Sequence, residues 1–241
     1  MSDTFAKNTI NPNLTFSVQR IGNEQTPIII VDNFFSSPET LMELAASEPS
    51  FTGQKTDYYP GVRKPISGDY AEQSLNVIEP IIREIFAVPS ANTSQVSLGA
   101  FSLATTPADK LRPIQCVPHI DTHHPYQFAV VHYLCSEHYG GTSFYRHKVT
   151  GYETITDARL EKYFQTLKQE VMSGGLPKLE YINGDTPLFI RIANVEVKFN
   201  RAVIYLSNAL HAGNINETLG LSANPKDGRL TANIFINFSG Q

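Results

Sequence analysis

The second half of the chain consists of short hydrophobic segments that are separated by turn residues. Each segment is rich in β-branched and aromatic residues and ends near glycine, proline, asparagine or aspartate, a pattern typical of strands in a sandwich or barrel. A helix is expected to interrupt them at 157–171, where apolar residues recur on one helical face. The strands are predicted at 96–104, 116–121, 127–135, 142–146, 202–208 and 229–238.

The first part of the chain predicts a strand followed by helices. A β-branched run at 27–32 indicates a buried strand. A helix should begin near Pro38, because proline suits a first helical turn and apolar residues follow at helical spacing. A second helix is expected near 72–87, where Pro80 should kink or split it. The pattern as a whole predicts a β-rich α+β fold.

The length of the chain indicates how many domains it forms, and its cysteines indicate the redox setting. At 241 residues the chain can bury one large core without disulfides or a structural metal. We interpret residues 1–241 as one domain, in which 1–94 form a strand-helix lead-in and helical support, and 95–241 form the β-rich core. The two cysteines, Cys116 and Cys135, form no C-x-x-C pair, which favours a reducing, cytoplasmic setting.

Charge and hydropathy exclude several partners. The chain has 19 Lys+Arg against 23 Asp+Glu, a net charge of −4, and no basic run that could follow a phosphate backbone. Its start lacks the basic and apolar stretches of a signal peptide, and no segment approaches the ~18 apolar residues of a membrane span. We expect a cytoplasmic protein that binds neither nucleic acid nor membranes.

The last predicted strand has two unlike faces. Every second position from 230 to 238 is apolar, whereas the alternate positions carry Arg229, Thr231, Asn233 and Asn237. Such a polar face belongs either to a solvated edge strand or to a strand that lines a polar pocket. The pocket explains Arg229 and Thr231, because a guanidinium and a hydroxyl two residues apart can hold one carboxylate.

Two histidines and one aspartate are the candidate metal ligands. His119 and Asp121 lie two residues apart in a predicted strand, so their side chains should leave the same face. An H-x-D triplet also arises by chance in a chain with seven histidines. His211 follows the strand at 202–208 and is either a third ligand or a strand-end histidine bonded to a loop. Two histidines and a carboxylate on one side of iron leave positions open for a bidentate cosubstrate and dioxygen.

From about residue 95 to 238 the chain resembles the iron(II)/2-oxoglutarate-dependent dioxygenases, particularly their prolyl-hydroxylase-like branch and its bacterial members of unassigned substrate. Residues 27–47 resemble the strand-helix lead-in of that branch. Five motifs in chain order carry the resemblance: His119-Ile120-Asp121, Tyr133-Leu134-Cys135, Gly140-Gly141-Thr142-Ser143-Phe144, His211 and Arg229-Leu230-Thr231.

The resemblance implies a double-stranded β-helix (jelly roll) core, with the N-terminal helices and the helical insertion packed outside it. It implies that the candidate triad holds Fe(II), and that Arg229 binds the distal carboxylate of 2-oxoglutarate with help from Tyr133 and Thr231. From its residues alone, Tyr133 is also compatible with a core tyrosine bonded to the backbone. The gap between His211 and Arg229, 229 − 211 = 18 residues, is about twice that of the family, which makes Lys226 the next candidate.

The activity implied is hydroxylation of an unknown small-molecule or peptidyl substrate, with release of succinate and CO2. One alternative is a cupin-like metalloprotein with the same triad and no 2-oxoglutarate, against which Arg229 and Thr231 argue. Another is a non-catalytic sensor or binding module on the same barrel. His123 and His124 are interpreted as rim or solvated residues rather than ligands. A segment that contains Tyr58, Tyr59, Arg63 and Lys64 is interpreted as a surface loop, with a lid over the site as the alternative.

Overall fold

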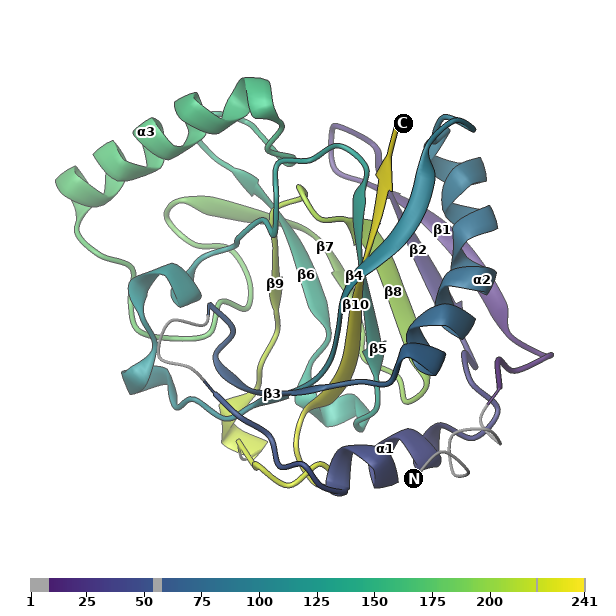
Figure 1. The fold of residues 1–241 in the computed structure, drawn as a ribbon. Helices are drawn as coiled ribbons and strands as arrows, with labels where there is room; N and C mark the ends of the chain where they lie inside the picture. Colours follow the sequence, from purple (N-terminus) through teal and green to yellow (C-terminus); the bar gives the residue numbers. More distant parts are fainter. Residues whose placement is uncertain (1–8, 54–57, 220, 241) are drawn as a thin grey trace.

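The computed structural model describes residues 9–53, 58–219 and 221–240 and shows two antiparallel sheets that pack against each other (Figure 1). The large sheet has the strand order β1-β2-β8-β5-β10-β4-β3, and the small sheet has the order β7-β6-β9. The strands are β1 (Thr15–Ile21), β2 (Thr26–Asp32), β3 (Gly61–Pro65), β4 (Thr93–Ala104), β5 (Gln127–Tyr133), β6 (Thr142–His147), β7 (Phe189–Val195), β8 (Arg201–Leu206), β9 (His211–Gly213) and β10 (Leu230–Ser239).

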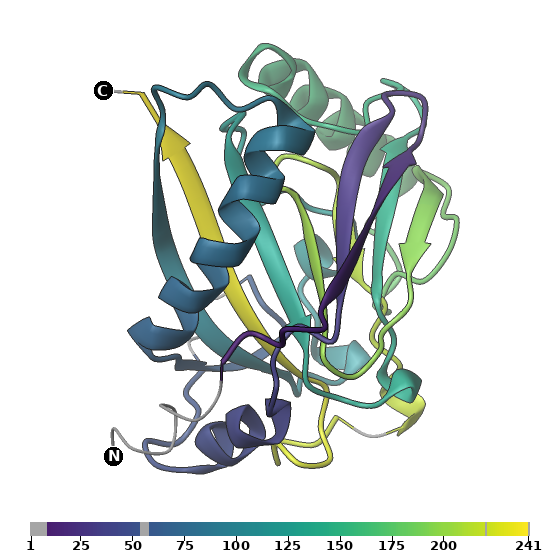
Figure 2. The same cartoon turned by 90° about the vertical axis from the view of Figure 1, so that its right-hand side faces the viewer.

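Three α-helices lie outside the sheets in the described part of the chain: α1 (Pro38–Ala46), α2 (Gly68–Phe86) and α3 (Asp157–Gly174). Side chains of α1 and α2 pack on the outer face of the large sheet, and Figure 2 shows α2 running along that face. The helix α3 is inserted between β6 and β7. The β-rich prediction is confirmed, as are the predicted positions of the three helices. No helix of the described residues is long and apolar enough to cross a membrane.

The two faces of β10 divide the interior into two cores. Its apolar positions join the core under α1 and α2, whereas its polar positions face the small sheet. Because β10 lies between β4 and β5, it is an inner strand and not the solvated edge strand that the sequence left open. The apolar positions are Leu230, Ala232, Ile234, Ile236 and Phe238.

One row of residues crosses the polar side of the large sheet. Thr231 of β10 is paired in register with Tyr133 of β5 on one side and with Ser102 of β4 on the other. Ser102 is in turn paired with Arg63 of the edge strand β3. Residues directly opposite each other in antiparallel strands share a face. We call Arg63, Ser102, Thr231 and Tyr133 the inner row.

The predicted strand at 116–121 is wrong. Pro113–Cys116 is a 3-10 helix, and the only ladder contact in the segment is an isolated bridge between His119 and His211. Pro113 and Pro118 lack the N–H that a strand would need for its hydrogen bonds, so the segment cannot extend a regular ladder.

Two further expectations differ from the structure in part. Pro80 does not split α2, which continues through it, and the fully buried Ile78 and Ile82 on either side hold the helix against the core. The kink expected as the other outcome stays a prediction. The segment interpreted as a surface loop contains a strand, β3, which extends the large sheet beyond β4. Lys64 of that strand is buried under α1, where its ammonium donates to the carbonyl oxygens of Leu44 and Ser47.

Candidate metal centre

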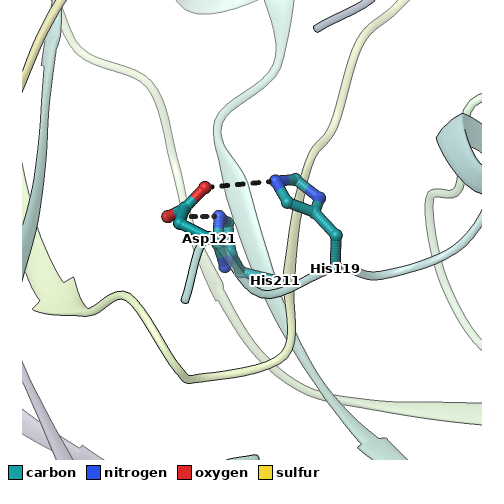
Figure 3. A group of neighbouring side chains, drawn as sticks. All are labelled: His119, Asp121 and His211. Carbon is teal, nitrogen blue, oxygen red and sulfur yellow. Dashed lines mark ion pairs between the residues drawn. The ribbon is translucent and has the colours of Figure 1, made fainter. Parts of the chain in front are cut away.

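The side chains of His119, Asp121 and His211 point toward one another (Figure 3). One nitrogen or oxygen atom from each lies within 4.8 Å of the other two. Nε2 of His119 is 3.7 Å from Oδ1 of Asp121, and Nε2 of His211 is 3.6 Å from Oδ2 of the same carboxylate. The carboxylate therefore faces both imidazoles, and the three residues that the sequence singled out are brought together.

Backbone hydrogen bonds place the three residues. The amide of His119 donates to the carbonyl oxygen of His211 over 2.9 Å, and the amide of His211 donates back over 3.0 Å. The amide of Asp121 donates to the carbonyl oxygen of Ser207 over 2.8 Å. A segment with little regular structure is thereby held against β9, so the cluster does not depend on the strand that the sequence predicted.

The hydrogen bonding of His211 defines its tautomer. Its Nδ1 lies 2.9 Å from the carbonyl oxygen of Ala209, and since a carbonyl only accepts, Nδ1 carries the proton. Nε2, which faces Asp121, then has the free lone pair that a metal ligand requires. The ring also packs against that of Tyr205, with centroids 4.7 Å apart.

Desolvation keeps both imidazoles in the form that binds metal. It lowers the pKa of His211 to about 4, and it lowers the pKa of His119 to about 4 with a further contribution from the nearby His211. Desolvation raises the pKa of Asp121, which His119 and Arg63 oppose. The side chain of His119 is 47% exposed whereas that of His211 is 6% exposed, so the cluster opens to solvent on the side of His119.

Arg229 is buried immediately before β10 and contacts the segment that leads into β6. Its Nε donates to the carbonyl oxygen of Gly140 over 3.1 Å, and its Nη2 donates to that of Gly141 over 3.0 Å. Arg229 is only 5% exposed. Among the described residues, no carboxylate forms an ion pair with it. A buried guanidinium with donors to spare and no anion fits a site for an anionic ligand.

Gly140 and Gly141, whose carbonyl oxygens accept the hydrogen bonds of Arg229, lie too close to neighbouring backbone for any side chain to fit. A Cβ on Gly140, whose φ is +78°, would lie 1.6 Å from the carbonyl oxygen of Asn214. A Cβ on Gly141 would lie 1.8 Å from the carbonyl oxygen of Val195. Any larger residue would push these backbones apart and move the acceptors that hold the guanidinium.

Tyr133 lies near Arg229, Thr231 is paired in register with Tyr133, and both hydroxyl groups already have partners. The hydroxyl of Tyr133 shares a hydrogen bond of 2.6 Å with Oγ1 of Thr142, and the Arg229 guanidinium carbon lies 5.9 Å from its ring centroid. Burial raises the pKa of Tyr133 to about 12, so the phenol stays protonated. Oγ1 of Thr231 accepts a hydrogen bond of 3.0 Å from the side-chain amide of Asn233. Tyr133 is thus bonded to a side chain and not to the backbone.

A model of one protein family, described as "Family of unknown function (DUF6445)", matches residues 12–236. The chain belongs to this family. A search of curated proteins found no match to the DUF6445 chain.

Several solved structures share part of the shape of the DUF6445 chain. HygX from Streptomyces hygroscopicus, solved with nickel and 2-oxoglutarate bound, has a TM-score of 0.49 at 11% identity, over 89% of this chain and 84% of HygX. SnoN, a non-heme alpha ketoglutarate dependent epimerase from nogalamycin biosynthesis, has a TM-score of 0.48 at 10% identity, over 88% of this chain and 78% of SnoN. AviO1 from Streptomyces viridochromogenes Tue57 has a TM-score of 0.44 at 11% identity, over 93% and 89%. TM-scores below 0.5 decide nothing about the function of the DUF6445 chain.

Two tyrosines near the cluster were given no role in it by the sequence, which placed Tyr59 in a loop or lid. The buried phenol of Tyr205 is close enough to both Asp121 and Arg229 for their charges to act on its pKa, which burial raises well above its usual value. The hydroxyl of Tyr59 is buried without a hydrogen-bond partner among the described residues. Alternation along the strand of 202–208 places Tyr205 on the same face as His211, whereas for Tyr59 the sequence offered only the lid alternative.

His123 and His124 lie outside the cluster. Nε2 of His123 is 3.9 Å from Oδ1 of Asp157 at the start of α3, and the side chain is half exposed. Nδ1 of His124 accepts a hydrogen bond from the amide of Tyr126. Among the described residues, neither histidine belongs to the group that could hold a metal ion.

Proposed function

We propose that this chain is an Fe(II)- and 2-oxoglutarate-dependent oxygenase that hydroxylates a small-molecule or peptidyl substrate. The observation that carries the proposal is the cluster of His119, Asp121 and His211, whose ligand atoms face one another and open to solvent on one side. Two imidazole nitrogens and one carboxylate oxygen are the facial donor set of non-haem iron oxygenases, which leaves coordination positions for a cosubstrate and dioxygen.

The donor atoms fit a divalent ion in charge as well as in type. Both histidines are neutral at pH 7, and the bond to Ala209 orients the free lone pair of His211 toward Asp121. Asp121 is held between the two imidazoles and forms no ion pair with a lysine or arginine in the described part of the chain. An ion would supply the positive charge that this carboxylate lacks.

The strand order supports a double-stranded β-helix around the site. The strands β4, β10, β5 and β8 are consecutive neighbours in the large sheet. Opposite them, β7, β6 and β9 are neighbours, and the bridge of His119 to His211 adds a fourth chain segment beside β9. Two facing sets of four segments are what a jelly roll requires, and the cluster lies at the edge of the small sheet that β9 forms.

When bound, Fe(II) and 2-oxoglutarate would activate dioxygen for hydroxylation of a C–H bond, with release of succinate and CO2. The residues of this chain bind and orient. Arg229 provides the cation for the distal carboxylate of 2-oxoglutarate, and Tyr133 and Thr231 flank it with hydroxyl groups. Apolar side chains between the sheets, including Phe144 and Val203, exclude water from this end of the site.

Spectroscopy and calorimetry test this proposal. Oxygen-free protein with Fe(II) and 2-oxoglutarate should develop a weak metal-to-ligand charge-transfer band in the visible, and calorimetry should show 2-oxoglutarate binding that depends on the metal. Metal binding without 2-oxoglutarate binding would point to a cupin-like metalloprotein. Binding of both without succinate formation on admission of oxygen would point to a sensor or binding module. If the protein binds neither, the proposal is wrong.

A further inference from the structure

Arg63 belongs to the inner row, on the side of the large sheet that faces the small sheet. The proposed binding of 2-oxoglutarate by Arg229 gives Arg63 no role. Arg63 stands at the open end of the inner row, on the edge strand β3, and is separated from Thr231 by Ser102 alone. Its neighbours along the strand point the other way: Val62 packs on the core under α1 and α2, and Lys64 is buried under α1. Alternation therefore directs Arg63 toward the same interior as Tyr133 and Arg229.

Arg63 also lacks a carboxylate partner, unlike four other arginines of this chain. Arg83, Arg146, Arg159 and Arg201 each form an ion pair with a glutamate or aspartate. Among the described residues no such pair involves Arg63, whose guanidinium carbon instead lies 4.9 Å from the ring centroid of Tyr59. Stacking on an aromatic ring fixes the guanidinium plane and leaves its N–H groups free to donate.

The guanidinium lies on the inner side of the large sheet, in the row that also holds Thr231 and Tyr133. Arg229, by contrast, is held by the carbonyl oxygens of Gly140 and Gly141. Arg63 lies over the ring of Tyr59. Burial raises the pKa of Tyr59, and the charges of Arg229 and Arg63 oppose that rise.

Two buried polar atoms on this side of the molecule have no hydrogen-bond partner in the described structure, the hydroxyl of Tyr59 and Oδ1 of Asn233. The side-chain amide nitrogen of Asn233 donates to Ser102 of the inner row over 2.9 Å, so its free oxygen belongs to the same neighbourhood. Buried polar atoms that the protein itself does not satisfy are expected where a polar ligand binds.

We propose that Arg63, stacked on Tyr59, binds an oxyanion of the primary substrate, a carboxylate or a phosphate, and so holds that substrate beside the metal. This inference rests on the proposed function and narrows it, because it assigns Arg229 to the cosubstrate and Arg63 to the substrate. The substrate class is an organic acid, an acidic or C-terminal peptide, or a phosphorylated metabolite. The forked donors of arginine match either oxyanion by two parallel hydrogen bonds.

Paramagnetic relaxation tests the assignment with simple probes. Protein loaded with Mn(II) and saturated with 2-oxoglutarate is mixed with acetate, inorganic phosphate or the neutral acetamide, and the relaxation rates of the methyl protons and of the phosphorus nucleus are measured. In the wild type, at least one of the two anions should relax faster than with metal-free protein, whereas acetamide should not. The anion that responds more strongly identifies the kind of oxyanion.

Three variants give the test its controls. R63Q should lower the affinity for the responding anion about tenfold or more, because a charge-assisted hydrogen bond is lost. R63K should retain part of that affinity, because it keeps the charge without the fork. R112Q should behave as the wild type, since Arg112 also lies over a tyrosine ring, that of Tyr58, at 5.3 Å, but is not part of the inner row.

The outcomes separate this inference from the proposed function. If neither anion responds in the wild type, or if R63Q responds as the wild type does, Arg63 binds no oxyanion and the inference is wrong. If R63Q instead weakens 2-oxoglutarate binding measured by calorimetry, Arg63 belongs to the cosubstrate site and the inference is equally wrong. If 2-oxoglutarate does not bind at all, the proposed function fails, but the anion titration with Mn(II) alone still decides the role of Arg63.

Discussion

Arg229 donates a hydrogen bond of 3.0 Å from Nη2 to the carbonyl oxygen of Gly141, and this contact joins the residue before β10 to the segment that leads into β6. Together with the bond to Gly140, it fixes the guanidinium from one side. The donors that remain can be offered to a ligand without any change in the side chain. Arg229 is therefore preorganised, which reduces the entropy lost when an anion binds.

Replacement of Arg229 by glutamine should weaken 2-oxoglutarate binding by about tenfold to a hundredfold, as expected for the loss of a hydrogen bond to a charged group. Isothermal titration with metal-loaded protein measures the change. Lys226→Gln is the matched control, because Lys226 is the nearby exposed cation that precedes β10. Weaker binding in the Lys226 variant together with normal binding in the Arg229 variant would transfer the role to Lys226.

Asp121→Ala should abolish both retention of Fe(II) and metal-dependent turnover of 2-oxoglutarate, because the two remaining imidazoles lose the carboxylate that faces them both. Metal content after gel filtration and succinate formation measure the two effects. Asp157→Ala is the control, since Asp157 also lies near a histidine, His123, but is 91% exposed. Full metal retention by the Asp121 variant would exclude this cluster as the metal site.

Gly141→Ala should destabilise the fold by about 2 kcal/mol or more, because the added Cβ would lie 1.8 Å from the backbone oxygen of Val195. Equilibrium unfolding in urea gives the change in free energy. Gly68→Ala offers the contrast, since nothing lies within 4 Å of a Cβ added there and the position begins α2. This variant should be neutral or up to about 1 kcal/mol more stable. Equal stability of the two variants would contradict the close approach of β6 and β7.

Stability should fall as the pH falls below about 6.5, in part because of His132. This histidine is buried between Tyr70 and Asn200, which it contacts through hydrogen bonds of 3.2 and 3.1 Å, and burial lowers its pKa from 6.5 to about 3. The unfolded chain therefore binds a proton below pH 6.5 that the folded chain does not bind until about pH 3. Unfolding is favoured across that window by up to about 1.4 kcal/mol per pH unit.

The variant His132→Gln should lose this component while it retains groups that can hydrogen-bond to Tyr70 and Asn200. The free energy of unfolding, measured between pH 7 and pH 4 for the variant and the wild type, isolates the effect, because His119 and His211 contribute equally to both. Parallel profiles would show that His132 is not the group responsible.

Periodicity in the sequence identified the elements that carry a regular apolar face. The strands β5, β8 and β10 and the helix α3 lie where the pattern placed them, because each alternates or repeats against a core. The edge strand β1 was missed, since six of its seven residues are exposed and carry no such pattern. β9 has three residues, too few for any period to show.

The site was predictable only in part for a similar reason. His119, Asp121, His211 and Arg229 stand in ordered motifs that a linear sequence displays. Arg63, which the sequence placed in a loop or lid, reaches the inner face because β3 adds to the edge of the large sheet, a tertiary pairing that no local pattern encodes. Tyr59 becomes part of the site for the same reason, since it immediately precedes that strand.

The reciprocal backbone bridge between His119 and His211 joins positions that are 211 − 119 = 92 residues apart. The unfolded chain cannot present both imidazoles at this spacing, so a resident ion would bind the folded state almost exclusively. By mass action, free metal at a hundred times its dissociation constant would add about 2.7 kcal/mol to the free energy of unfolding. On the proposed function, the cellular supply of the metal would then set not only how much of this protein is active but also how much of it survives proteolysis.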